Sequence, residues 1–195
     1  MNQKHLLFIT YVIVWLLLAI NPWYRADWLL ENILVFVAFP VILWSEHHFG
    51  FSVAAAWMLF VFFVLHAVGA HYTYSEMPWF DSVTRFFGFE RNNYDRLTHF
   101  MFGFLLFVPY FELFNSFEKS KRHVFIFTLI FLIAASGVYE ILEWLATEVT
   151  HADLGTAFLG TQGDQWDAQK DMVLCYLGTL LAAFIWHRRL LKHPS

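Results

Sequence analysis

The chain of 195 residues is 59% hydrophobic and only 14% charged, with a mean hydropathy of +0.52. Soluble domains are about half apolar and about a quarter charged, so this composition argues against a soluble globule, and the net charge of −4 excludes the basic surface that nucleic-acid binding requires. The single cysteine, Cys175, excludes an internal disulfide and a thiolate metal cluster.

A chain in lipid forms helices of about 20 mostly apolar residues, because about 30 Å of hydrocarbon is crossed at about 1.5 Å per residue. The first such segment, residues 5–20, is followed by Asn21 and Pro22 instead of the small residues of a cleavage site. We therefore expect a retained helix and not a signal peptide. The second segment, residues 28–44, is the weakest because it contains the charged Glu31.

The third and fourth apolar segments carry ionisable residues near their ends. The third, residues 53–70, has His66 within its apolar run. The fourth, residues 99–114, begins with His99, and Asp95 lies four residues earlier. Residues four apart share one face of a helix, so this carboxylate and this imidazole are expected to point the same way.

The last two segments are associated with acidic residues at helical spacing. The fifth, residues 123–146, places Glu140 and Glu143 on one face among apolar neighbours. The sixth, residues 172–191, follows three aspartates, which stack along one side if the last helix already includes them. These aspartates are Asp164, Asp167 and Asp171.

Together the segments predict an all-α, polytopic membrane protein. We expect one integral-membrane domain over residues 1–195, a compact bundle of about six transmembrane helices with both termini on one side. Lysine and arginine are more frequent in the loops on that side, which predicts that both termini are cytoplasmic. These residues are Lys4, Lys119, Lys121, Arg122, Arg188, Arg189 and Lys192.

This topology brings the polar clusters of four helices to the same depth, near the outer interface. Ionisable groups at membrane depth cost about 2.5–3.5 kcal/mol on insertion scales, so each needs a reason. Some of these residues also have a purely structural explanation. His66 could be an interfacial residue, Asp95 a helix cap, and the three aspartates a solvated first helical turn. Glu140 and Glu143 need a cation, a proton or hydrogen-bond donors. The arginines that could donate to them are Arg85, Arg91 and Arg96.

Four sequence motifs occur between residues 71 and 172. In order they are HYTYSEMPWFD, NNYDRLTHFMFGF, GVYEILEW and GTQGDQWDAQKDM. From about the third helix to the last they resemble the YjdF-like family of bacterial inner-membrane proteins, and the aspartate motif is the most specific of the four. The resemblance implies a multi-pass protein of the bacterial inner membrane. It implies no reaction, and no catalytic residue carries over from it.

Carboxylates and imidazoles without thiolates are ligands for divalent metals such as Zn, Mn or Mg. We therefore expect a metal-dependent hydrolase or transferase that acts on a lipid or lipid-linked substrate at the outer, periplasmic interface. The expected metal ligands are Asp95, His99, Glu140, Glu143, Asp164 and Asp167, and the expected catalytic residues are His66, His99 and Asp171.

Two other functions stay open. Intramembrane carboxylates also form ion or proton pathways in transporters, although the polar groups here gather at one interface and the chain lacks two similar halves. A non-enzymatic scaffold would use the same groups only to hold four helices together.

Overall fold

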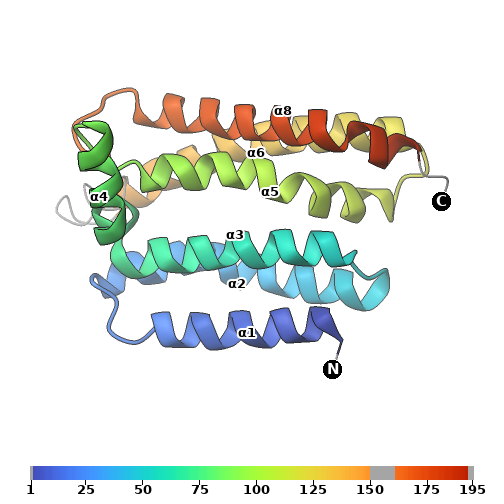
Figure 1. Ribbon diagram of the computed structural model, residues 1–195, viewed down its shortest axis with the longest axis horizontal. Helices are drawn as coiled ribbons and strands as arrows, with labels where there is room; N and C mark the ends of the chain where they lie inside the picture. Colours follow the sequence, from blue (N-terminus) through green and yellow to red (C-terminus); the bar gives the residue numbers. More distant parts are fainter. Residues whose placement is uncertain (1, 150–160, 193–195) are drawn as a thin grey trace.

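The computed structural model describes residues 2–149 and 161–192, and these ranges contain helices but no strand (Figure 1). Five of these helices are long and apolar enough to cross a membrane, and a sixth apolar helix is shorter. This architecture confirms the predicted all-α polytopic bundle. The long helices are α2 (Arg25–His48), α3 (Val53–Tyr72), α5 (Tyr94–Asn115), α6 (Lys121–Val149) and α8 (Asp167–Lys192), and the shorter one is α1 (Gln3–Leu18).

The six helices lie side by side, and the short helix α4 (Pro78–Phe87) lies across one end of the bundle (Figure 1). Helices α1 and α2 pack on α3, α6 and α8 pack on α5, and contact between α3 and α5 joins the two halves. At the α4 end, α3 and α6 end while α5 and α8 begin (Figure 1). The chain therefore gathers four helix ends, distant in sequence, in one place.

Two helices begin five residues before the segments predicted from hydropathy. Helix α5 begins at Tyr94 instead of residue 99, and α8 begins at Asp167 instead of residue 172. A hydropathy window excludes these polar first turns, yet the two helices pack on each other and bury Tyr94 and Asp167 of these turns. As a result, Asp95 and Asp171 lie on regular helix, which fixes their directions.

The distribution of apolar side chains fits a lipid-embedded bundle. Phe107 of α5 and Leu132 of α6 are completely buried at the centre of the core. Large apolar side chains also cover the outside, as at Phe184 of α8, which is 83% exposed. An apolar exterior of this kind is stable in hydrocarbon and not in water.

Helices α5 and α8 approach closely because each presents a glycine to the backbone of the other. A Cβ added at Gly103 would lie 2.1 Å from the carbonyl oxygen of Cys175, and one added at Gly178 would lie 2.1 Å from that of Phe100. Small residues allow such backbone contact between membrane helices. The contact sets the register of α8 against α5, about two helical turns from Asp171.

Candidate functional site

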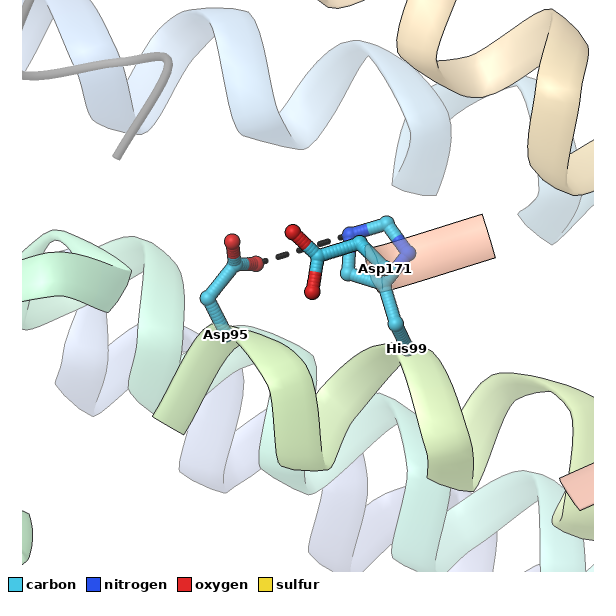
Figure 2. A group of neighbouring side chains, drawn as sticks. All are labelled: Asp95, His99 and Asp171. Carbon is cyan, nitrogen blue, oxygen red and sulfur yellow. Dashed lines mark ion pairs between the residues drawn. The ribbon is translucent and has the colours of Figure 1, made fainter. Parts of the chain in front are cut away.

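The buried imidazole of His99 lies between a carboxylate of its own helix and carboxylates of neighbouring helices. Its Nε2 lies 3.5 Å from Oδ1 of Asp95, one turn earlier on α5, and its Nδ1 lies 3.5 Å from Oε1 of Glu140 on α6. Asp171 of α8 lies close to the same ring (Figure 2). Each ring nitrogen therefore faces a carboxylate.

Two groups of side chains around His99 have the composition of a metal site. One combines His99 with Asp95 and Asp171, and the other combines it with Glu140 and Glu143. Within each group, one ligand atom from each residue lies within 4.8 Å of the others. A neutral imidazole has one ring nitrogen that accepts and one that donates, so it can ligate an ion on one side and donate an N–H on the other.

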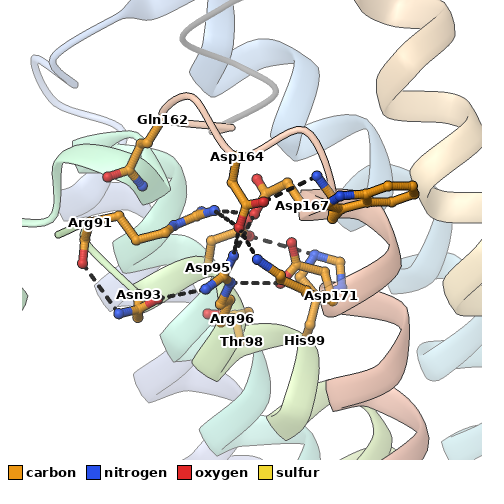
Figure 3. A network of polar contacts seen from close by, with 12 residues as sticks. Arg91, Asn93, Asp95, Arg96, Thr98, His99, Gln162, Asp164, Asp167 and Asp171 are labelled. Carbon is orange, nitrogen blue, oxygen red and sulfur yellow. Dashed lines mark hydrogen bonds and ion pairs between the residues drawn. The ribbon is translucent and has the colours of Figure 1, made fainter. Parts of the chain in front are cut away.

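Next to His99, two aspartates near the start of α8 pair with cations (Figure 3). Arg96 Nη2 lies 2.6 Å from Oδ2 of Asp164 and 3.2 Å from Oδ1 of Asp167. Arg91 also forms an ion pair with Asp167, and Lys170 Nζ lies 2.5 Å from Oδ2 of Asp164. We refer to these five residues as the arginine–aspartate cluster.

The ionised form of Asp164 is stabilised by several donors. Hydrogen bonds from Lys170, from the backbone N–H of Trp166 and from Arg96 hold the pKa of Asp164 well below its ordinary value. A carboxyl whose pKa is lower in the folded state stabilises the fold above its unfolded-state pKa, about 3.9 for aspartate, and this contribution disappears as the pH falls through the folded-state value.

We therefore expect Asp164→Asn to lower the thermal unfolding midpoint at pH 7, by an amount that shrinks as the pH falls below about 4. The measurement is the unfolding midpoint of the detergent-solubilised protein, native and variant, between pH 7 and pH 3. A difference that stayed constant over this range would contradict the assignment of the lowered pKa to Asp164.

Amide side chains attach the segment before α8 to the start of α5. The backbone N–H of Asn92 donates to Oε1 of Gln162 at 2.9 Å, and Nε2 of Gln162 donates to the carbonyl of Asn92 at 2.9 Å. The buried Asn92 side chain also donates to the carbonyl of Met77 and to Oδ1 of Asp81, both at 2.8 Å. These contacts hold the arginine–aspartate cluster against α4.

His66 lies on the other side of the site and has partners for both ring nitrogens. Its Nε2 lies 3.2 Å from the carbonyl oxygen of Glu31, and its Nδ1 lies 2.5 Å from the hydroxyl of Tyr74. Because a carbonyl oxygen can only accept, Nε2 donates to it, while the Tyr74 hydroxyl lies within hydrogen-bond distance of both Nδ1 and the backbone carbonyl oxygen of His66. Both ring nitrogens of His66 are therefore held by partners within the protein.

A cavity of about 40 Å³ separates His66 from His99. Its polar lining includes Tyr74, Asp95 and Tyr139 as well as the two histidines. A buried water needs about 10–15 Å³ and two to four polar partners. The cavity therefore has the size and the lining to hold water beside His99.

The structure brings most of the predicted site residues together. Around His99 lie Asp95, Asp171, Glu140 and Glu143. Asp164 and Asp167 lie beside them in the arginine–aspartate cluster, while His66 lies across the cavity. Of the three arginines considered as partners for the glutamates, Arg91 and Arg96 form their ion pairs with aspartates, and Arg85 donates to the hydroxyl of Ser82 at 3.3 Å.

One buried acidic residue of this end, Glu31, had appeared in the sequence only as an interruption of an apolar segment. It is 6% exposed, and the hydroxyl of Tyr139 donates to its Oε2 at 3.2 Å. The sequence does contain a signal for a buried polar face here. Asp27 and Glu31 are four residues apart, the spacing that also places Asp95 and His99 on one face of a helix.

The apolar helices and the buried polar site at one end define a multi-pass membrane protein. The chain belongs to the family of predicted membrane proteins designated DUF2238, whose model matches residues 3–192. It is similar to inner membrane protein YjdF of Escherichia coli (strain K12), with 28% identity over 174 residues, which are 88% of this chain and 83% of that protein. No solved structure matches the chain. These findings confirm the resemblance noted in the motifs, and the protein is a multi-pass inner-membrane protein.

Proposed function

We propose that this protein holds one divalent metal ion at His99. In this proposal it acts as a metal-dependent hydrolase or transferase on a lipid or lipid-linked substrate at the periplasmic interface, with both termini cytoplasmic. The observation that carries the proposal is the buried imidazole with a pair of carboxylates on each side. This arrangement supplies the nitrogen and oxygen ligands that zinc and manganese prefer, whereas magnesium favours oxygen ligands alone.

The charges on the two sides of His99 favour a position for the ion beside Glu140 and Glu143. On the other side, Arg96 Nε lies 4.0 Å from Oδ1 of Asp171 and offsets part of its charge. Within residues 2–149 and 161–192, no lysine or arginine forms an ion pair with Glu140 or Glu143. A carboxylate removed from water without a counter-ion is costly, and a divalent cation would supply the missing charge.

In this assignment His99 ligates the ion through Nδ1, together with Glu140 and Glu143. Its Nε2 then carries the proton and faces Asp95 at 3.5 Å. A carboxylate on the distal N–H of a ligating histidine fixes the ring and raises its basicity. Three protein ligands leave a position for water or substrate, as in catalytic zinc sites.

A groove beside the site supports a lipid as the substrate. It measures about 840 Å³ and lies between α5 and α8, open to the outside. Arg96, Lys170 and Trp166 form its polar part, and Phe100 and Val173 belong to its apolar part. Guanidinium and ammonium groups bind phosphate, so the groove fits a phosphate head with an apolar tail.

The test is the metal content of the purified protein, native and with Glu140→Gln and Glu143→Gln combined. We expect one ion per native chain, a background level in the variant, and chelator-sensitive release of phosphate from a lipid diphosphate by the native protein alone. A native protein without metal above background would overturn the proposal. Metal retained in the variant would overturn the ligand assignment.

The water-sized cavity favours a second candidate, an ion or proton pathway. It joins His99 and Asp95 to His66 and Tyr139, and from there hydrogen bonding extends to Glu31 on α2. Chains of titratable side chains and water carry protons through membrane proteins. Proton flux in proteoliposomes, without any metal in the protein, would favour this function over the first.

A further inference from the structure

The short helix α4 lies across the end of the bundle and carries exposed aromatic side chains (Figure 1). Trp79, Phe86 and Phe87 are all exposed, and Phe86 is 83% exposed, as much as the lipid-facing Phe184 of α8. Trp79 and Phe86 are two helical turns apart and Phe87 follows, so the three share one side of α4. An apolar face of this kind needs a partner other than water.

Other sides of α4 are held to the bundle by a hydrogen bond and an aromatic contact. Asp81 accepts a hydrogen bond from the buried side chain of Asn92 at 2.8 Å. The ring of Phe80 packs edge-on against that of the buried Tyr94 of α5, with a centroid distance of 5.6 Å. These two contacts fix the rotation of α4 about its own axis, so its aromatic face is directed away from the bundle.

The aromatic face of α4 belongs to a longer series of aromatic side chains at this end of the bundle. The ring centroid of Trp79 lies 5.8 Å from that of Tyr72 at the end of α3, which lies 5.3 Å from that of the exposed Trp23. At the other end of α4, the rings of Phe87 and Phe89 stack at 5.6 Å. Tryptophan and tyrosine are enriched where membrane helices leave the hydrocarbon. The series therefore has the composition of an interfacial aromatic belt.

Phe89 connects the face of α4 to the groove between α5 and α8. Gly88 ends α4 in the left-handed conformation, with a φ of 67°, and the backbone N–H of Phe89 then donates to the carbonyl of Thr84 at 2.9 Å. Phe89 thereby lines the groove together with Phe100 of α5 and Val173 of α8. Val173 is exposed on the outside of a spanning helix, so the aromatic face of α4 continues a surface that faces lipid.

We propose that α4 is an interfacial helix that binds the lipid leaflet at this end of the bundle. Its axis lies in the membrane plane, and Trp79, Phe86 and Phe87 enter the boundary between headgroups and acyl chains, where such helices bury their apolar face by about 5–10 Å. Because the contact of Asp81 with Asn92 joins α4 to the start of α5, this position holds the mouth of the groove at the level of the headgroups. The proposal does not depend on a metal at His99.

The experiment measures the depth of a nitroxide label on the full-length protein in vesicles of phosphatidylethanolamine and phosphatidylglycerol. Cys175 is the single cysteine and is buried, so Cys175→Ser provides a background in which one new cysteine carries the label. The label is placed by Phe86→Cys, by Arg85→Cys as the matched control, and by Phe184→Cys as the reference for acyl-chain contact. Arg85 is also exposed but lies about 100° around the helix from Phe86. Collisions of the label with oxygen, which concentrates in lipid, are compared with collisions with a water-soluble nickel chelate.

We expect the ratio of oxygen to nickel collisions at position 86 to be at least about threefold higher than at position 85 and lower than at position 184, the order of depth for a helix at the interface. Equal ratios at positions 86 and 85 would place this face in water and overturn the proposal. Few collisions with either reagent would also overturn it, because protein, such as a second copy of this chain, would then cover the face. If Phe86→Cys does not fold, the label at Phe87→Cys decides by the same comparison.

Discussion

Replacing His99 with alanine is expected to reduce the bound metal from one ion per chain to background. His99 is the one residue that belongs to both groups of candidate ligands among the described residues. Without it, carboxylates alone remain on either side, and the nitrogen ligand that favours zinc is lost. The measurement is elemental analysis of the purified variant, with a metal titration followed by calorimetry.

Three further substitutions locate the ion relative to His99. Asp95→Asn should weaken binding by about 10- to 100-fold, the usual effect of changing the partner of a ligating histidine. Glu143→Gln should abolish binding, and Asp164→Asn should retain it. If instead Asp95→Asn abolished metal binding and Glu143→Gln only weakened it, the ion would lie on the side of Asp95 and Asp171. Loss of metal in Asp164→Asn would favour the ligand set predicted from the sequence.

Gly178→Ala is expected to destabilise the whole bundle. The new Cβ would lie 2.1 Å from the carbonyl oxygen of Phe100, a backbone atom that cannot move without separating α5 from α8. Overpacking typically costs about 1–3 kcal/mol, and a backbone clash lies at the upper end of this range. A loss of about 3 kcal/mol corresponds to a decrease of about 6–12 °C in the unfolding midpoint of a chain of this size.

The matched control for this prediction is Gly137→Ala on α6. A Cβ at Gly137 would meet only the sulfur of Met172, at 3.6 Å, which is an ordinary van der Waals distance. This variant should unfold within about 2 °C of the native protein. Similar midpoints for Gly178→Ala and Gly137→Ala would contradict the close packing of α5 against α8.

The sequence by itself predicted the fold class, about six apolar helices, of which the structure has five long and one shorter, and the local pairs of polar residues. These features depend on short-range physics: the hydropathy of about 20 consecutive residues, and the spacing of three or four that places side chains on one helix face. Asp95 with His99, and Glu140 with Glu143, could therefore be paired without a structure. Glu31 could not, because its partner, Tyr139, is more than a hundred residues away.

Only the tertiary structure decided which acidic groups face His99 and which face the arginines. In the sequence, Asp164, Asp167 and Asp171 form one run of equivalent carboxylates. The structure divides them, because α8 packs on α5 in a single register. Asp164 and Asp167 form close ion pairs with cations, while Asp171 lies beside His99, with Arg96 4.0 Å away. That register depends on glycine contacts between two helices, an interaction that has no signature in the local pattern of either one.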